Sequence, residues 1–540
     1  MKTREQVTPE KVRGGFYSPE SLVQACFQRI QALLPGAKDL TLLEPSAGDG
    51  AFIRGLDQGP LGRHIKEVLA VELLPEEAAK CRAAARSGSW RGHVITGSFL
   101  EWTASARELF DIAVGNPPFV RFQFVSDEDK EIAAWLAVIR GRLLRGVSNL
   151  WIPVFLGALE RLRPSGAFAF IIPSECFTGI SAGTVREWLL ANTERLQADL
   201  FPPGRFPGVL QQVIILSGIR RAEPARKSAR LSFVEHLSND QTIKWAHDAP
   251  IGSETWTRYL LAPEHLEAFD EARRLPLVRQ LRQMARLEVS TVTGANEFFS
   301  VDQATVESYE LAPWTIPLLP RARFAPGLRF TSQDHKRLVA AGHKALLLYF
   351  NGQSLVPTKQ AGASRYLALG VRQAIDKRYK CRARDPWYRV PLVRPGALML
   401  SKRTHWYPRL LLNEARVATT DTIYQGSMTA AWEGRERDLV SGFHNSLTLL
   451  SAEIEGRSFG GGVLELVPSE IARLSVPAVP GFGSEFERLN EVARSAGDPM
   501  MLVEETDRLL SKLDAGINDD ILAALQEARE ELSRRRFERN

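Results

Sequence analysis

The chain has 540 residues, 44% of them hydrophobic, which is too much material for one core and predicts two or three domains. The net charge of +6 permits a polyanionic partner without requiring one. The four cysteines form no CxxC pair and no zinc-ligand pattern, which argues against a metal site. None of them follows a proline, which argues against the Pro-Cys nucleophile of a cytosine-C5 methyltransferase. The N-terminus is too polar for a signal peptide, and no apolar run reaches the roughly 18 residues of a membrane span. We therefore expect a cytoplasmic or nucleoid-associated protein without a membrane partner.

Up to about residue 225, apolar runs typical of strands alternate with helical patterns. The runs are Leu40–Leu43, Val68–Val71, Val94–Ile95, Asp111–Val114, Ala167–Ile172 and Val213–Ser217. The helical patterns are Ser21–Leu34, Glu76–Arg86, Trp151–Leu162 and Val185–Thr193. This alternation predicts an α/β fold with a largely parallel, doubly wound sheet that is covered on both faces.

The first strand runs into an acid and a Gly-x-Gly turn, formed by Glu44, Gly48, Asp49 and Gly50. Glycines at such a turn let the backbone pass close to a bound nucleoside. The next strand ends in Glu72, an acid placed to hold ribose hydroxyls. There is no Walker lysine, and acids in the turn repel a pyrophosphate but tolerate a sulfonium and an amino group. The turn therefore favours S-adenosylmethionine over a nucleoside triphosphate or NAD.

A later strand leads into Asn116-Pro117-Pro118-Phe119. The two prolines fix the backbone and remove two amide donors. The side-chain oxygen of Asn116 and the carbonyl of Pro117 can each accept one hydrogen of a planar amino group, which raises electron density on its nitrogen. Phe119 can stack on a base that has left the duplex. The tetrapeptide indicates methyl transfer to a planar nitrogen.

In this order, the motifs resemble those of adenine-N6 DNA methyltransferases of restriction–modification systems, and most of all the Taq-type enzymes (gamma motif order). The resemblance covers the first 220 or so residues well and the remainder more loosely. It implies S-adenosylmethionine as the cofactor and a flipped-out adenine in double-stranded DNA as the substrate. It also implies a Rossmann-like class I methyltransferase domain followed by a mixed α/β target-recognition domain. A separately encoded restriction endonuclease would be a possible partner.

The resemblance also implies a set of site residues. The catalytic residues would be Asn116, Pro117, Phe119 and Phe206. The cofactor-binding residues would be Tyr17, Ser18, Glu44, Ser46, Ala47, Gly48, Gly50, Phe52, Glu72, Leu73, Ser98, Phe99, Asn116 and Pro118. Ser98 departs from the family, which usually has an aspartate there that accepts from the cofactor's adenine amino group. The departure predicts a weaker or water-mediated contact with the adenine.

After residue 225 the alternation weakens and arginines are interleaved with aromatic residues. We expect a catalytic domain over 1–225, a DNA target-recognition domain over 226–480 and a charged helical tail over 481–540. Residues 371–411 hold eleven Lys or Arg against two acids, a composition that suits contact with phosphates. The candidate DNA-binding residues are Arg382, Arg384, Arg389, Lys402, Arg403 and Arg409. A solvated basic face over an aromatic core is the alternative for each of them.

Two other functions remain open at this point. The same catalytic turn serves methyltransferases that act on adenine in RNA or on a protein glutamine, although those enzymes are usually shorter and favour tyrosine where Phe119 stands. A DNA-binding protein that kept the fold without catalysis is the second, and the intact Asn116 and Glu72 argue against it. We find no signature of a fused nuclease and expect a monomer.

Overall fold

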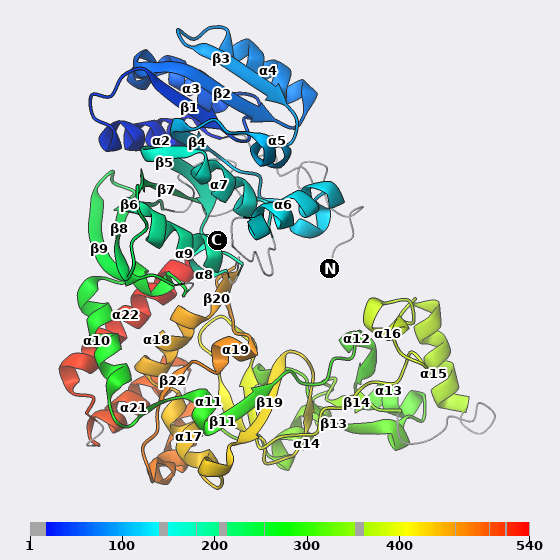
Figure 1. The fold of residues 1–540 in the computed structure, drawn as a ribbon. Coiled ribbons are helices and arrows are strands. Elements are labelled where there is room, and N and C mark those ends of the chain that lie inside the picture. The colour runs from blue at the N-terminus through cyan, green and yellow to red at the C-terminus, as the bar shows by residue number, and fades with distance from the viewer. Residues whose placement is uncertain are drawn as a thin grey trace. The chain divides into compact units, whose positions relative to one another are not determined.

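The computed structural model describes residues 18–139, 149–179, 181–202, 204, 213–252, 254–350, 361–459, 461–495, 497–513 and 516–538. The chain forms two compact units, Met1–Pro263 (unit 1) and Glu264–Asn540 (unit 2) (Figure 1). Within the described residues, no helix is both long enough and apolar enough to cross a bilayer.

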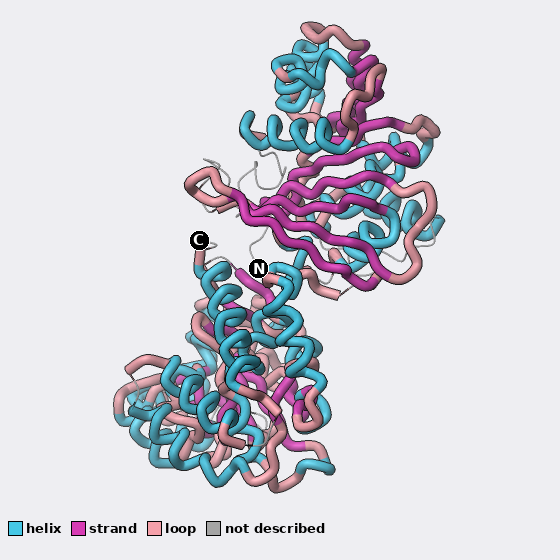
Figure 2. The backbone as a smooth tube through the Cα atoms, turned by 90° about the vertical axis from the view of Figure 1, so that its left-hand side faces the viewer, coloured by secondary structure: helices cyan, strands magenta, loops and turns pink. Residues whose placement is uncertain are grey.

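In the described part of unit 1, nine strands form one twisted sheet in the order β3-β2-β1-β4-β5-β7-β6-β8-β9 (Figure 2). The strands are β1 (Leu40–Glu44), β2 (Ile65–Glu72), β3 (Arg91–Thr96), β4 (Phe110–Gly115), β5 (Leu162–Pro173), β6 (Thr193–Leu200), β7 (Val213–Arg220), β8 (Ser228–His236) and β9 (Thr242–Pro250). Strands β1 to β5 are mutually parallel, and β7 runs antiparallel between β5 and β6. This topology confirms the predicted Rossmann-like class I fold.

Helices cover both faces of this sheet. They are α2 (Glu20–Leu33), α3 (Ala51–Gln58), α4 (Pro75–Ala85), α5 (Phe99–Ser105), α6 (Asp127–Ile139), α7 (Trp151–Glu160), α8 (Glu175–Thr178) and α9 (Gly183–Asn192). Alternate residues of β5 point to opposite faces. Ala167, Ala169 and Ile171 join the core under α2 and α3, whereas Phe168 and Phe170 meet Phe155 of α7.

The first unit extends beyond the predicted boundary at residue 225. Strand β8 pairs in parallel with β6, and β9 pairs antiparallel with β8, so both continue the main sheet. Buried Trp256 and Leu260 follow them. The sheet therefore absorbs the segment that weak alternation had assigned to the second domain, and the units divide at Pro263.

The described part of unit 2 contains several small sheets with helices packed around them. Its strands are β10 (Val278–Gln280), β11 (Ala285–Glu288), β12 (Ser300–Val301), β13 (Thr315–Leu319), β14 (Leu346–Leu348), β15 (Leu398–Ser401), β16 (Arg403–Thr404), β17 (Leu410–Leu412), β18 (Ala418–Thr419), β19 (Ile423–Met428), β20 (Arg457–Phe459), β21 (Val463–Glu465) and β22 (Ser475–Pro477). Its helices are α10 (Pro263–Arg274), α11 (Leu281–Met284), α12 (Asn296–Phe299), α13 (Gln303–Ser308), α14 (Ser332–Ala340), α15 (Ala361–Arg372), α16 (Tyr379–Arg382), α17 (Glu436–Phe443), α18 (Ser446–Glu455), α19 (Pro468–Ile471), α20 (Phe486–Ser495), α21 (Met500–Ser511) and α22 (Asp519–Phe537). Two four-stranded sheets, β11-β19-β15-β17 and β12-β14-β13-β18, form the centres of its main cores.

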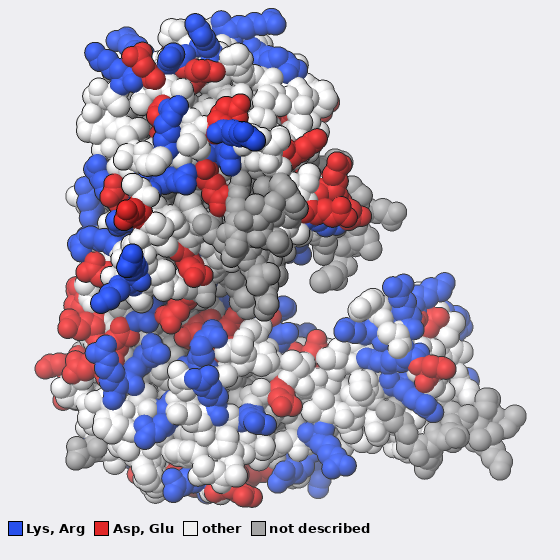
Figure 3. Space-filling view, in the orientation of Figure 1, with Lys and Arg blue, Asp and Glu red and all other residues white. Residues whose placement is uncertain are grey.

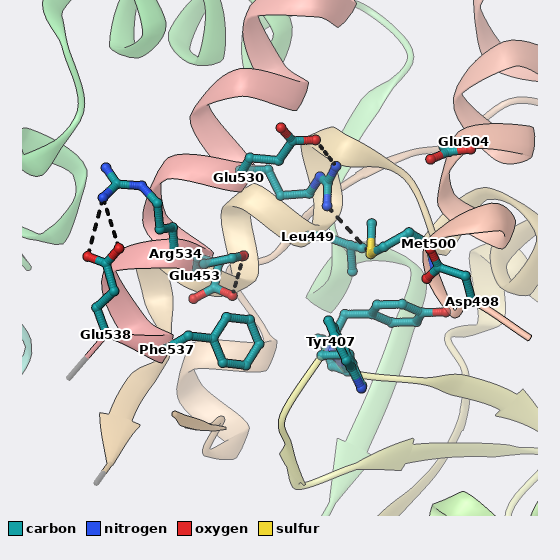
Figure 4. A pocket seen from close by; sticks show the side chains of 14 residues that line it. Tyr407, Leu449, Glu453, Asp498, Met500, Glu504, Glu530, Arg534, Phe537 and Glu538 are labelled. Carbon is teal, nitrogen blue, oxygen red and sulfur yellow. Dashed lines mark hydrogen bonds and ion pairs between the residues drawn. The ribbon is translucent and has the colours of Figure 1, made fainter. Parts of the chain in front are cut away.

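The segment 481–540 is helical as predicted, but it is part of unit 2 rather than a separate tail. Phe486 and Leu489 of α20 and Leu510 of α21 lie in the same core as the β11-β19-β15-β17 sheet. Helix α22 packs along α18, and a cavity of about 470 Å³ lies among α18, α21 and α22 (Figure 4). Its lining includes Tyr407 and Phe537. The high charge of the segment concealed these buried faces.

Candidate active site

The turns that carry most of the described site residues of unit 1 follow the carboxyl ends of β1 to β4. The sheet register pairs Leu43 of β1 with Ala113 of β4, and Glu72 of β2 with Thr96 of β3. The turns that follow these strands therefore lie along one edge of the sheet. Ligands of doubly wound sheets bind at this edge.

The turn after β1 is held in place by β2. The amide of Ala47 donates to the carbonyl of Val71 (3.0 Å), and the amide of Gly48 donates to Oε2 of Glu72 (2.8 Å). Gly48 and Gly50 have φ angles of +54° and +85°, in the left-handed region that glycine adopts most readily. A Cβ on Gly48 would meet no atom within 4 Å, so this side of the turn is open to a ligand.

Replacing Gly50 with alanine should destabilise the protein by about 1–3 kcal/mol. The new Cβ would lie 3.0 Å from the Cα of Cys81 and 3.3 Å from the Cβ of Ala84, in addition to the strain of positive φ. Gly48→Ala is the matched control, because it carries the backbone strain without the contact. Urea unfolding without cofactor measures both, and equal losses would show that packing against α4 contributes nothing.

Glu44 is buried at the end of β1, with 1% of its surface exposed. Among the described residues, its Oε2 has no hydrogen-bond partner. Burial, followed by the charges of Glu72 and Asp49, raises the pKa of Glu44 well above its usual value. Asp49 forms an ion pair with Arg54 (2.6 Å). The turn is thus less negative than its sequence indicated, and an orphaned carboxyl oxygen remains for a cationic or hydrogen-donating group of a ligand.

Glu72 is anchored by backbone amides at the end of β2. Its two oxygens accept from the amides of Gly48 (2.8 Å) and Leu74 (2.9 Å). A carboxylate has about four acceptor positions, so two remain for the hydroxyls of a ribose. The adjacent Leu73 is 59% exposed, an uncommon placement for a leucine and a suitable apolar surface for a purine. These residues fit the nucleoside part of S-adenosylmethionine.

The side-chain amide of Asn116 is oriented by Ser18. Its Nδ2 donates to Oγ of Ser18 (3.1 Å), which directs Oδ1 away from that residue. The hydroxyl of Ser46, in the turn after β1, donates to the main-chain carbonyl of Asn116 (3.2 Å). Hydrogen bonds therefore join Ser18, Ser46 and Asn116, which the sequence assigns to the site, although Ser18 and Asn116 are 98 positions apart.

The proline carbonyls of the turn differ in their partners. The carbonyl of Pro118 accepts from the amide of Val120 (3.0 Å). Within the described part of the chain, no group donates to the carbonyl of Pro117. The second predicted acceptor is therefore available beside the oriented amide of Asn116.

The aromatic candidates have different surroundings. Phe119 is half-buried and packs against the core under α2. Phe52 is 2% exposed and places its ring edge-on to Phe27, and Phe99 is buried beside Trp102. Both rings are thus packed among other side chains, and their contact with the cofactor stays a prediction. Two further candidates, Tyr17 and Phe206, lie outside the described residues.

Ser98 begins α5 and accepts from the amide of Glu101 (3.5 Å). Its hydroxyl donates to Oδ1 of Asp129 in α6, at 2.6 Å. Sequence reasoning missed Asp129, because the contact joins residues 31 positions apart and no motif contains the aspartate.

The predicted DNA-binding residues of unit 2 separate into two groups. Arg409 donates to the carbonyls of Ala322 (3.2 Å), Ala325 (2.9 Å) and Gly327 (2.8 Å), and burial lowers the pKa of its guanidinium. Arg384 donates to the carbonyls of Val292 (2.6 Å) and Thr293 (2.7 Å). Both guanidinium groups thus bind carbonyl groups within unit 2, and their contact with phosphates stays a prediction.

The other four candidates are more accessible. Lys402 and Arg403 share Glu465 as an ion-pair partner, so their charge is partly neutralised. Arg382 and Arg389 are exposed, and Arg382 lies over the ring of Tyr379. Lys and Arg side chains gather over α15 and α16 on the face shown in Figure 3. This surface keeps the basic and aromatic character that the sequence indicated.

Two family models match the chain. Residues 76–201, which contain the catalytic turn, match the Eco57I restriction-modification methylase. Residues 253–511 match the C-terminal domain of the type II methyltransferase M.Eco57I. This second match begins near the boundary of unit 2 and continues through α21, in agreement with the placement of 481–511 within that unit.

Several characterised proteins are similar over most of their length. The type II methyltransferase M.AccI of Acinetobacter calcoaceticus is 23% identical over 81% of each chain. M.XamI of Xanthomonas campestris pv. amaranthicola is 22% identical over 86% of this chain and 85% of its own. A solved DrdV–DNA complex is more distant, with a TM-score of 0.49 at 11% identity over 91% of this chain and 58% of that one. The two family matches and the two methyltransferases together show that the chain is a DNA methyltransferase of a restriction–modification system.

Proposed function

We propose that the protein transfers the methyl group of S-adenosylmethionine to N6 of a flipped-out adenine at a specific site in double-stranded DNA. The observation that carries the proposal is the catalytic turn, in which Asn116 has an oriented amide and the Pro117 carbonyl accepts from no described residue, at the edge that also holds Glu44 and Glu72. The relatives are named as type II methyltransferases, and one matching family model is that of a restriction-modification methylase, which supports DNA as the substrate.

The cofactor supplies an electrophilic methyl group, and the residues of this chain bind and orient what surrounds it. Glu72 would hold the ribose, Leu73 would cover one face of the adenine, and Glu44 would face the cationic part. These assignments use carboxylate acceptor positions and apolar surface that contacts among the described residues leave available at this edge of the sheet.

The target amino group is activated by acceptors rather than by a strong base. Oδ1 of Asn116 and the carbonyl of Pro117 accept its two hydrogens, which favours a tetrahedral nitrogen with its lone pair directed at the methyl group. Phe119 stacks on the extruded base and offsets part of the few kcal/mol that flipping costs. The proton that leaves the nitrogen after transfer passes to solvent.

Methylation-aware sequencing of DNA from cells that express the protein tests this function directly. N6-methyladenine should appear within one recurring sequence motif, and expression of Asn116→Ala should abolish it. Parallel transfer of a tritiated methyl group to DNA, RNA and protein separates the proposed substrate from the alternatives. Transfer to RNA or to a protein glutamine, with none to DNA, would overturn the proposal.

Arg382 and Arg389 are proposed to contact DNA phosphates, because both are exposed and belong to the basic segment at and after α16. Replacing both with alanine should weaken binding to all DNA sequences and lower the slope of log K against log salt by about 2. Arg282→Ala, which removes an exposed arginine elsewhere in unit 2, is the control. Fluorescence anisotropy at several salt concentrations measures the slope, and an unchanged slope would exclude these contacts.

We further propose that the enzyme acts as a monomer on the nucleoid, as the modification component of a defence system with a separately encoded nuclease. We expect a monomer because one chain carries both the proposed catalytic unit and the proposed recognition unit. Light scattering at working concentration measures the mass, and a value of two chains would contradict this assignment.

A further inference from the structure

The end of β3 is next to the nucleoside-binding residues of β2. Glu72 pairs in register with Thr96, and the amide of Gly97 donates to the carbonyl of Glu72 (2.9 Å). Ser98 follows immediately and begins α5. A nucleoside whose ribose is held by Glu72 therefore has the Ser98 turn as the neighbouring wall for its base. No carboxylate stands in this turn itself.

A carboxylate reaches this wall from α6. Oδ1 of Asp129 accepts from Oγ of Ser98 (2.6 Å), and Oδ2 accepts from Oγ of Ser126 (3.0 Å). The amide of Asp129 in turn donates to Ser126 (3.1 Å), so the aspartate is held in one orientation. Within the described part of the chain, no lysine or arginine pairs with Asp129. Its charge is met only by hydroxyl donors.

We propose that Asp129, oriented by Ser98, accepts a hydrogen bond from the exocyclic amino group of the cofactor's adenine. The inference rests on the proposed function, since it presumes that S-adenosylmethionine binds at this edge. A carboxylate with two hydroxyl donors has acceptor positions left, whereas the only hydrogen of Ser98 is already donated to Asp129. Serine thus serves as the link that brings a carboxylate of another helix to the end of β3.

The proposal predicts discrimination between two bases. Adenine carries an amino donor at position 6, and hypoxanthine carries a carbonyl oxygen that a carboxylate repels. A hydrogen bond to a charged acceptor contributes enough to change affinity about 10- to 100-fold. The unaltered protein should therefore prefer S-adenosylhomocysteine to S-inosylhomocysteine by about that factor.

Isothermal titration of the full chain with these two compounds tests the inference. Asp129→Asn should abolish the preference, because the amide both weakens the hydrogen bond to adenine and removes the charge that repels the carbonyl of hypoxanthine. Ser98→Ala should reduce the preference several-fold by releasing the aspartate. Ser98→Asp combined with Asp129→Asn should restore it, because a carboxylate then stands at the end of β3. Thermal melting confirms that each variant is folded.

Asp127→Asn is the matched control, because Asp127 lies in the same turn of α6 but is exposed and paired with Lys130 (2.7 Å). It should bind both compounds as the unaltered chain does. A folded Asp129→Asn protein that keeps the full preference for adenine would overturn the inference alone. Absence of binding by the unaltered chain would instead overturn the proposed cofactor, and the inference with it.

Discussion

Asn116→Ala should lower the rate of methyl transfer to DNA by about 100- to 1000-fold, the effect expected when one preorganised polar group is removed from a reaction centre. The variant loses the oxygen that accepts from the target amino group but leaves the turn after β1 and Glu72 intact. Affinity for S-adenosylhomocysteine should change much less. Single-turnover transfer of a tritiated methyl group measures the chemical step, and isothermal titration measures binding.

Ser18→Ala is the companion variant, since Ser18 accepts from Nδ2 of Asn116 without facing the target. Loss of this orienting bond should slow transfer only several-fold. Equal losses in both variants would mean that orientation, rather than the amide oxygen, provides the effect. A folded Asn116→Ala protein with a rate within tenfold of the unaltered enzyme would contradict the mechanism.

The sequence predicts the edge at the carboxyl ends of β1 to β4 well, because these strands are short and apolar and a glycine or an acid marks where most of them end. Strand β6 was missed for the opposite reason. It contains a buried charge, Asp199, whose oxygens are bound by Arg29 of α2 (2.9 Å) and His236 of β8 (2.8 Å). Neither partner is close to Asp199 in sequence, so the segment resembles a polar helix. Only the fold brings Arg29 and His236 to the aspartate. The contact between Asp199 and His236 also links β6 to β8, a strand that lies beyond the domain boundary predicted at residue 225.

Composition also failed to separate two kinds of arginine in unit 2. Arg382 and Arg409 occur in the same basic stretch, yet one is exposed and the other binds three carbonyls. Only the position of those carbonyls, more than 80 residues away, distinguishes them. Likewise Asp129 is an ordinary helix-first-turn residue in the sequence and becomes a candidate ligand only through Ser98.

Arg536→Ala should destabilise unit 2 by about 3–5 kcal/mol, the loss expected when one partner of a buried ion pair is removed. Arg536 is 2% exposed and donates to both oxygens of Glu453 in α18 (2.7 and 2.9 Å). It also donates to the carbonyls of His405 (2.7 Å), Trp406 (3.2 Å) and Gly462. These contacts link α22 to three other segments of the unit, and alanine would leave Glu453 buried with Ser533 as its one remaining partner among the described residues.

Arg534→Ala is the matched control, two residues away on the same helix. Arg534 is exposed and pairs only with Glu538 at 3.2 Å (Figure 4), an interaction that contributes about 0.5 kcal/mol or less. Urea unfolding followed by tryptophan fluorescence compares the two variants. Similar small losses would show that α22 is peripheral, as the sequence had suggested. A large loss confined to Arg536 would mean that α22 is required for a folded unit 2, because the charges that resemble a solvated tail are the ones that hold the helix in the core.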